Sequence, residues 1–435
     1  MKDSQAEVLR FVRENDVKFV RLAFCDITGT QKNRAIMAGE LPRAFEQGIG
    51  FDAAAVRGFA HEDKADLFLV PDCSTVAILP WRPAHERVMR MFCDIRRPDG
   101  TEYEYSGRAV LKRAVQRAAD KGFLCRVGTE CEFYLFHTDE NGDPTGTPLD
   151  YGSYGDITPL DRGENIRREI CLALEEMGLQ PESSHHEQGP GQNEIDFRYA
   201  DALTAADNFM TFKMVVKAVA AQHGLYASFL PKPLPEHSGN GLHIDLSLAQ
   251  GGKNLFETGP RHCECAESFI QGILDRTGDM TAFLNPLTNS YHRFGAFEAP
   301  RYVTWSRYNL SQLIRIPATT GEANRMELRS PDPACNPYLA FALLIHAGLD
   351  GVEQKRSLMP PCNRDLSQSS EESAQRLPVS LKEALERAQD SAFIGRWLPS
   401  GVRDAYLRLK WDEWNAYEAA SDPQAWEYGA CFGTI

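Results

Sequence analysis

The chain has 435 residues, of which 43% are hydrophobic and 25% charged, an ordinary globular composition that excludes a disordered or collagen-like polymer. The net charge of -14 provides no general positive field, so no nucleic-acid partner and no acidic membrane surface is expected. The length exceeds what one hydrophobic core usually serves, and it predicts two domains of unequal size.

The cysteines and the N-terminal residues bear on the compartment. Eleven scattered cysteines favour free thiols in a reducing environment over a disulfide framework. The first residues are polar with no apolar stretch behind them, and no run approaches the ~20 apolar residues of a membrane span. We therefore expect a cytoplasmic protein.

The first hundred residues are rich in strand patterns. A short helix is expected over residues 5–14, followed by an alternating strand over residues 17–26 that ends in the turn Asp26-Ile27-Thr28-Gly29. Further strand patterns lie at residues 67–70, 75–79 and 88–95. These patterns predict a small strand-rich domain that ends near residue 104.

Helices and strands alternate in the rest of the chain. A helical pattern begins at Gly107 and reaches a glycine suited to a C-cap at Gly122. Two more amphipathic helices are expected over residues 164–177 and 207–223, between strand candidates, which predicts an α+β second domain. Residues 381–426 are helical in composition, and we expect them to serve packing.

Several strand candidates carry charged groups on one face. In residues 128–136, Glu130 and Glu132 share a side because alternate residues of a strand point the same way. The same pattern recurs at residues 193–197, 242–248 and 325–329. Glu187 precedes Glu194 by a Gly189-Pro190-Gly191 turn that can bring the two carboxylates together. Paired carboxylates in apolar strands need a cation or a strong partner.

If these strands curve around one cavity, its lining predicts a metal site. The expected ligands are Glu130, Glu132, Glu187, Glu194, Glu327 and His243. Carboxylate oxygens favour Mg²⁺ or Mn²⁺ over zinc, and six ligands suit two ions better than one. The nearby arginines that suit phosphate or carboxylate are Arg293, Arg315, Arg325 and Arg329. Metals, acids and arginines together indicate phosphoryl transfer.

A simpler explanation exists for any single strand, because Glu and Arg often form a solvated face or cross-strand ion pairs. Four such strands with apolar opposite faces favour a site instead. The sequence contains no P-loop and no Rossmann fingerprint, so a nucleotide needs another kind of site.

Five ordered motifs resemble type I glutamine synthetase. They are Gly128-Thr129-Glu130-Cys131-Glu132-Phe133, His185-His186-Glu187 with Gly191-Gln192-Asn193-Glu194, Gly241-Leu242-His243, Asn285-Pro286 with Asn289-Ser290-Tyr291, and Asp332-Pro333-Ala334-Cys335-Asn336-Pro337-Tyr338. The resemblance extends from about residue 5 to about residue 350 and is weaker beyond.

The resemblance implies an α+β fold with an N-terminal β-grasp domain, residues 1–104, and a C-terminal catalytic domain, residues 105–435, that has a curved antiparallel sheet. It implies a dodecamer of two hexameric rings, with active sites between neighbouring subunits. The implied activity belongs to nitrogen metabolism: an ATP-dependent ligase joins ammonia to the γ-carboxylate of L-glutamate through γ-glutamyl phosphate, using Mg²⁺ or Mn²⁺.

The resemblance also implies a role for particular residues. One ion is expected at Glu132, Glu187 and Glu194, and the other at Glu130, His243 and Glu327. The residues expected to bind ATP are Glu182, Asp245, Ser247, Arg315 and Arg325. The residues expected to bind glutamate are Glu132, Gly239, Arg293 and Arg329. The expected catalytic residues are Asp52, which accepts the ammonium proton, Glu298 in a closing flap, and Arg315.

Four positions depart from the family pattern. Asp52-Ala53-Ala54-Ala55 replaces Asp-Gly-Ser-Ser, the segment between Arg293 and Glu298 is one residue shorter, and Ser238 replaces an asparagine. The fourth is Leu310, which stands where the family has an arginine at the transferring phosphate. We expect Arg307 to substitute for it, although a solvated surface arginine is an equally good explanation of that residue.

Two other functions remain open. A γ-glutamyl-amine ligase keeps the ATP, metal and glutamate groups but accepts a small organic amine, and the altered flap and alanine run suit a larger acceptor. A non-catalytic sensor or structural protein fits the loss of the arginine at Leu310. The preferred metal, the regulators and the exact oligomer are likewise open.

Overall fold

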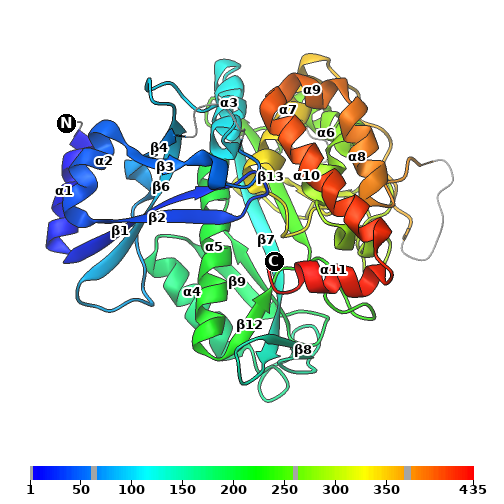
Figure 1. Cartoon of the computed structure of the whole chain (residues 1–435). Helices are drawn as coiled ribbons and strands as arrows, with labels where there is room; N and C mark the ends of the chain where they lie inside the picture. The colour runs from blue at the N-terminus through cyan, green and yellow to red at the C-terminus, as the bar shows by residue number, and fades with distance from the viewer. Residues whose placement is uncertain (1–2, 60–65, 258–262, 367–373) are drawn as a thin grey trace.

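Two β-sheets organise the chain, one in each part (Figure 1). The computed structural model describes residues 3–59, 66–257, 263–366 and 374–435. The strands of the N-terminal sheet are β1 (Val17–Cys25), β2 (Gln31–Met37), β3 (Ile49–Asp52), β4 (Asp66–Pro71), β5 (Ala77–Ile78) and β6 (Arg87–Arg96). Their order is β2-β1-β6-β4-β3 with β5 beside β6, and only the β1–β6 pair is parallel among the pairs described.

Short helices cover this first sheet. They are α1 (Asp3–Glu14), α2 (Leu41–Gln47) and the 3-10 helices Ala38–Glu40, Ala53–Ala55 and Cys73–Thr75. Alternate residues of the central strands point into a separate core, in which Val20, Leu22, Leu69 and Met91 are fully buried. The N-terminal part therefore has the strand-rich character expected from its sequence.

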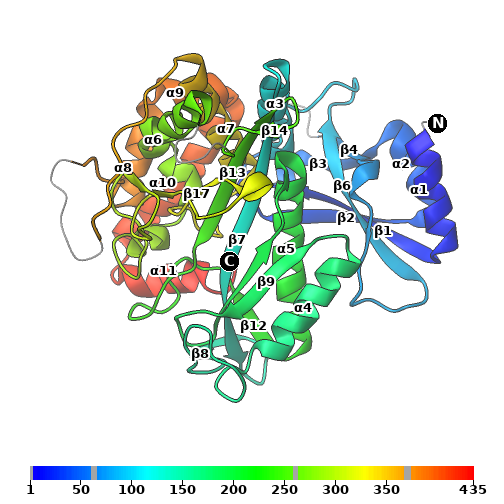
Figure 2. The same cartoon turned by 180° about the vertical axis from the view of Figure 1, so that it is seen from behind.

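The second sheet curves through the rest of the molecule. Its strands are β7 (Phe123–Thr138), β8 (Pro144–Pro148), β9 (Pro181–His186), β10 (Gln192–Phe197), β11 (Ala200–Asp201), β12 (Leu225–Ser228), β13 (Leu242–Gln250), β14 (Lys253–Asn254), β15 (Trp305–Ser306), β16 (Ile314–Arg315) and β17 (Met326–Leu328). The main path is β15-β16-β17-β13-β7-β10-β9, and all its described pairs except β15–β16 are antiparallel. The long strand β7 is the centre of this sheet (Figures 1 and 2).

Helices lie on both sides of β7. They are α3 (Gly107–Asp120), α4 (Glu164–Glu176), α5 (Ala202–Gln222), α6 (Glu264–Leu284), α7 (Pro337–Glu353), α8 (Leu381–Asp390), α9 (Ala392–Trp397), α10 (Ser400–Ala419), α11 (Pro423–Cys431) and the 3-10 helices Thr288–His292 and Gly321–Ala323. Helices α4 and α5 lie on one side, and α6 to α10 form a cluster on the other (Figures 1 and 2). No helix of the described chain is long and apolar enough to cross a membrane.

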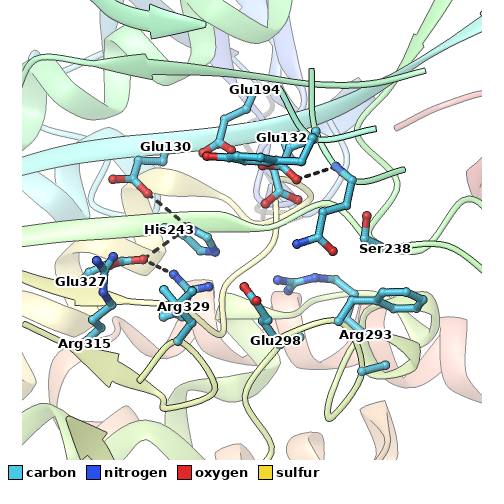
Figure 3. Close-up of a pocket in the computed structure, with 18 of the residues that line it drawn as sticks. Glu130, Glu132, Glu194, Ser238, His243, Arg293, Glu298, Arg315, Glu327 and Arg329 are labelled. Atoms are coloured by element: carbon cyan, nitrogen blue, oxygen red, sulfur yellow. Dashed lines mark hydrogen bonds and ion pairs between the residues drawn. The ribbon is translucent and has the colours of Figure 1, made fainter. Parts of the chain in front are cut away.

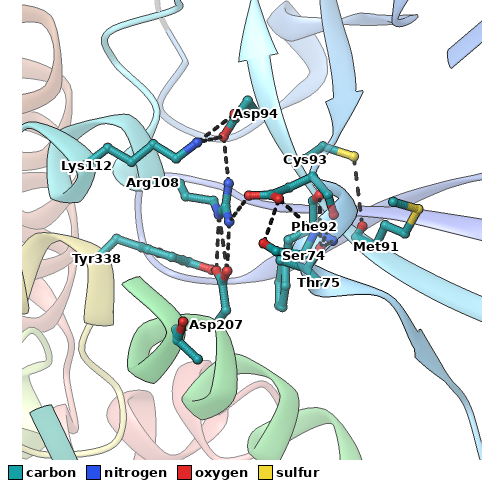
Figure 4. A network of polar contacts seen from close by, with 12 residues as sticks. Ser74, Thr75, Met91, Phe92, Cys93, Asp94, Arg108, Lys112, Asp207 and Tyr338 are labelled. Atoms are coloured by element: carbon teal, nitrogen blue, oxygen red, sulfur yellow. Dashed lines mark hydrogen bonds and ion pairs between the residues drawn. The ribbon is translucent and has the colours of Figure 1, made fainter. Parts of the chain in front are cut away.

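One buried guanidinium joins the two parts (Figure 4). Arg108 of α3 is within 2.7 Å of Asp72 and 2.6 Å of Asp94, both from the N-terminal part, and within 2.9 Å of Asp207 on α5. The hydroxyl of Tyr338 donates to Asp207 at 2.7 Å. Burial opposes the charge of Arg108, but its carboxylate partners, Asp207 foremost, raise its pKa above the ordinary range.

Strong local signals identified several elements correctly. The strand expected over residues 17–26 is β1, and the helix expected from Gly107 is α3, whose N-cap Ser106 accepts from the Ala109 amide at 3.4 Å. All eleven cysteines are free, as expected.

Other elements differ from expectation. The strand expected at residues 75–79 is shorter, because the 3-10 helix ends at Thr75 and β5 covers only Ala77–Ile78, and α5 begins at Ala202 rather than near residue 207. The pattern missed α6 and α7 entirely. Nearly every residue of α7 is buried, so α7 has no polar face, and α6 has only a narrow polar stripe that includes the exposed Glu264 and Asp275.

Candidate active site

The charged strand faces line one cavity of about 700 Å³ (Figure 3). All six expected metal ligands line it, and they are Glu130, Glu132, Glu187, Glu194, His243 and Glu327. The loop of residues 293–299 closes one side. The strands place the acids together because Glu132 pairs in register with Glu194 and Glu130 with His243, across adjacent antiparallel strands.

Two groups of side chains could each hold a cation. In the first, His243 Nδ1 lies 3.2 Å from Glu130 Oε2 and 3.5 Å from Glu327 Oε1. In the second, the ligand atoms of Glu132, Glu194 and His243 lie within 4.8 Å of one another. The family resemblance assigned Glu187 to the same ion as Glu132 and Glu194. In the structure, the ligand atoms of Glu187, Glu194 and His185 form a further group, which shares Glu194 with the second group.

The crowded carboxylates are electrostatically costly without a cation. Burial first, and then the charges of Glu132, Asp196 and Glu187, raise the pKa of Glu194 well above its ordinary range. Burial likewise raises the pKa of Glu132, together with the charge of Glu187. Asp196 has a buried Oδ1 with no hydrogen-bond partner in the described chain. This donor set of carboxylate oxygens and one imidazole fits divalent ions such as Mg²⁺ or Mn²⁺.

Arginines lie on the opposite wall of the cavity (Figure 3). Arg315 Nη1 is 2.9 Å from Glu327 Oε2, and Arg329 also pairs with Glu327. Arg293 is held by the carbonyls of Ser330 and Pro331 at 2.9 and 3.1 Å. A Cβ at Gly239 would lie 2.5 Å from Arg293 Cγ, so only glycine allows this approach.

The loop beside Arg293 has a strained backbone at its tip. Phe297 and Glu298 adopt φ values of +47° and +67°, which are uncommon for residues with side chains. Both residues line the cavity, and so do Tyr154 and Leu310. The cavity lining therefore includes exposed aromatic and aliphatic surface as well as charged groups.

Some expected site residues lie elsewhere. Asp52, Glu182, Asp245, Ser247 and Arg325 are not among the lining residues of this cavity. Arg325 remains adjacent, since it pairs with Asp245 Oδ2 at 2.5 Å and lies 3.4 Å from Glu130.

Asp52, Glu182 and Arg307 make their described contacts with residues that do not line the cavity. The side chain of Asp52 accepts from the Ala54 amide at 2.9 Å, on the N-terminal sheet. Glu182 pairs with Arg198 at 3.2 Å. Arg307 does not line the cavity, and its guanidinium is 6.0 Å from the Trp305 ring centroid. The position of Arg307 therefore offers its substitute role no support within this chain.

The structure adds residues that the sequence did not single out. Tyr154, His185, Gln188, Asp196 and Phe297 all line the cavity. His185 and Asp196 had a visible signal, because they lie on the same acidic strands as the expected ligands. Tyr154 and Phe297 come from irregular segments, where no side-chain period indicates a direction.

A buried brace supports the turn after β9. His186 Nε2 contacts Asp150 Oδ1 at 2.8 Å, and its Nδ1 contacts the Glu187 carbonyl at 2.7 Å. Asp150 also accepts from the Gly191 amide at 2.9 Å. Burial opposes ionisation, but hydrogen bonds from His186 and from the Arg162 and Gly152 amides lower the pKa of Asp150 to about 2. The brace fixes the turn between the Glu187 and Glu194 positions.

The chain matches two family models that together span most of it. Residues 16–98 match the glutamine synthetase β-grasp domain, and residues 104–429 match the glutamine synthetase catalytic domain. A glutamine synthetase of Methanosarcina mazei is 45% identical over 98% of this chain and 96% of its own, and one of Clostridium saccharobutylicum is 44% identical over 96% of both.

Solved structures give the same result for the fold. A GmaS structure in complex with ADP has a TM-score of 0.88 at 31% identity, covering 99% of both chains. GmaS without ligand has a TM-score of 0.86 at 31% identity, covering 97% of this chain and 98% of its own. The expected α+β fold with a β-grasp domain and a catalytic domain is thus confirmed. The chain belongs to the glutamine synthetase family of ATP-dependent ligases.

Proposed function

We propose that this protein is a glutamine synthetase, which joins ammonia to the γ-carboxylate of L-glutamate at the expense of ATP. The observation that carries the proposal is the single cavity in which six metal-ligating side chains face Arg293, Arg315 and Arg329. The curated relatives at 44–45% identity carry the same activity in their names.

The proposed reaction has two steps. The γ-carboxylate of glutamate attacks the γ-phosphorus of ATP, and ADP leaves, which produces γ-glutamyl phosphate. Ammonia then attacks the acyl carbon and inorganic phosphate leaves. Divalent ions held by the Glu130–His243–Glu327 and Glu132–Glu194 groups would supply charge neutralisation for the phosphates.

The residues of the chain have separate tasks. Arg315 stabilises charge on the transferring phosphoryl group, while Arg293 and Arg329 bind the carboxylates of glutamate. The Gly239 backbone lies against Arg293, which lets the substrate approach closely. Glu298, on the strained loop tip, closes the site and excludes water, and Asp52 accepts the proton of the ammonium nitrogen. In this proposal the protein forms a dodecamer, and Asp52 contributes to the active site of a neighbouring subunit. The proposed compartment is the cytoplasm.

A direct assay tests the proposal. Phosphate release from ATP is measured with Mg²⁺ and glutamate, using ammonium, methylamine, ethanolamine and putrescine as acceptors, and the amide product is identified by mass spectrometry. Glutamine should form with the highest kcat/KM. If an organic amine exceeds ammonia tenfold, the acceptor assignment is wrong. If no acceptor supports phosphate release, the non-catalytic alternative stands.

The second candidate, a γ-glutamyl-amine ligase, is favoured by the apolar side chains that line the cavity. Tyr154, Phe297 and Leu310 are 65, 50 and 37% exposed and line the cavity, although ammonia has no apolar atoms to bury against them. The GmaS fold match covers nearly the whole chain. In an amine ligase, Phe297→Ala should lower kcat/KM for the amine and leave that for ammonia unchanged.

A further inference from the structure

A second cavity lies between the two parts of the chain, away from the proposed active site. It has a volume of about 320 Å³, and we call it the seam pocket. Arg21 and the turn of residues 28–31 come from the N-terminal part, and Lys213 and Lys217 come from one face of α5. None of its described lining residues is an aspartate or a glutamate, and the terminal carboxylate of Ile435, which also lines the pocket, forms no described ion pair with these three cations.

The three cations of the seam pocket lack ion-pair partners among the described residues. Lys213 Nζ donates to the Pro333 carbonyl at 2.7 Å and lies 5.3 Å from the Phe229 ring centroid. Lys217 Nζ reaches only the Thr434 carbonyl, at 3.5 Å. An ammonium group has three donors, so each lysine keeps donors without a described acceptor. In a chain of net charge -14, three unpaired cations in one cavity need an explanation.

Nearby acids do not neutralise these cations. Asp332 acts on Lys213 only at a distance, and its carboxylate instead accepts from the amide of Asn285 at 2.9 Å. Asp26 pairs with Lys32 at 3.6 Å and accepts the Thr28 and Thr30 amides. Burial lowers the pKa of Lys217 to about 8, because the charged ammonium loses solvation. A bound anion would offset that loss and favour the charged form.

A separate observation specifies the kind of anion. The buried Oε1 of Gln31, at the rim of β2, has no hydrogen-bond partner, and its Nε2 contacts only the sulfur of Met214 at 3.6 Å. An unpaired acceptor in a positive pocket favours a ligand that is both an anion and a donor. Hydrogen phosphate is a dianion near neutral pH with one O–H group, whereas sulfate and dicarboxylates are dianions without one.

We propose that the seam pocket binds a phosphate group, either as free hydrogen phosphate or as a small phosphate ester whose own hydroxyl reaches Gln31. Arg21, Lys213 and Lys217 supply the charge, and the Gln31 amide selects a ligand with a donor. This site is separate from the proposed ligase chemistry, and the cavity is large enough for a ligand of several heavy atoms beyond phosphate.

Calorimetric titration of the full chain tests the proposal. The titration uses EDTA and no divalent metal, so that the carboxylates of the other cavity repel anions. Inorganic phosphate should bind, and Lys217→Met should weaken it about tenfold or more, because one charge-assisted contact is lost. The matched control is Lys382→Met, since Lys382 is exposed on α8 and outside the pocket. Equal phosphate affinity in Lys217→Met and the parent chain would overturn the site.

Two further measurements check the ligand. Sulfate should bind more weakly than phosphate in the parent chain, and Gln31→Leu should remove that preference. Glycerol 3-phosphate distinguishes the sources: tighter binding than phosphate identifies an ester, and weaker binding identifies free phosphate. Thermal unfolding gives an independent readout, because phosphate should raise the Tm of the parent and Lys382→Met but not of Lys217→Met. Equal affinity for sulfate and phosphate in the parent chain contradicts the phosphate assignment.

Discussion

The crowding of carboxylates in the acidic cavity predicts a strong effect of divalent cations on stability. Burial and neighbouring negative charges raise the pKa of Glu194 and of Glu132, so the cation-free native state carries repulsion that the unfolded chain does not. A cation that binds only the native state stabilises it by about 2.7 kcal/mol at a hundred times its Kd.

This stabilisation by a bound cation corresponds to a measurable shift of Tm. An unfolding entropy of about 2.1 cal/mol/K per residue corresponds to about 0.7 kcal/mol/K for the roughly 330 residues that follow the first sheet. A stabilisation of about 2.7 kcal/mol should therefore raise the Tm by about 4 °C for each saturated site. Differential scanning fluorimetry with Mg²⁺, Mn²⁺ or EDTA measures it.

Replacing one acid separates the repulsion between carboxylates in the cation-free state from the stabilisation by bound cations. Glu194→Gln removes a charge from the cluster with little change of shape, so it should raise the Tm in EDTA and reduce the shift produced by Mg²⁺ or Mn²⁺. Glu175→Gln, an exposed change on α4, should alter neither. The reasoning fails if the metals shift the parent by less than about 1 °C, or if Glu194→Gln keeps the full shift.

Three other substitutions test different parts of the molecule. Glu327→Ala should lower kcat by at least about 10²-fold in a chain that still folds, because Glu327 joins the cation group to two arginines, and a variant with near-parental turnover refutes that role. Leu310→Arg should raise kcat by up to about 10²-fold if the cavity lacks a phosphate-binding arginine, whereas a loss of activity in steady-state assays indicates that Leu310 has been adapted to another acceptor. Arg108→Met leaves Asp207 buried without its cation, so it should lower the free energy of unfolding by about 3–5 kcal/mol in urea titrations. The exposed control is Arg10→Met. A loss below about 1 kcal/mol would show that the carboxylates find other partners.

The sequence predicted the acidic cavity because a strand has a strict period of two. Glu130 and Glu132 on β7 could be placed on one face without knowing the neighbouring strands, and the same was true of Glu194 on β10. Glu327 followed from the same alternation at residues 325–329, and Glu187 followed from the Gly189-Pro190-Gly191 turn that separates it from Glu194.

Long-range and irregular features were beyond the sequence pattern. Phe297 and Tyr154 reach the cavity from loops, and the direction of a loop side chain depends on tertiary contacts. The ion pairs of Arg108 join residues as far apart as 72 and 207, which no local period connects. Helix α7 escaped prediction because burial on nearly every side removes the polar stripe on which the helical pattern depends, and the stripe of α6 is narrow.

The Arg108 network also limits how the two parts of the chain can be exchanged. Asp72 and Asp94 lie on the N-terminal side and pair with Arg108 on the other side, where Asp207 is a third partner of the same guanidinium. A β-grasp domain transplanted from a relative would have to bring carboxylates at the same two positions, or leave a guanidinium short of partners in a buried junction. A chimera of the two domains should therefore be designed with these four residues kept together as one unit.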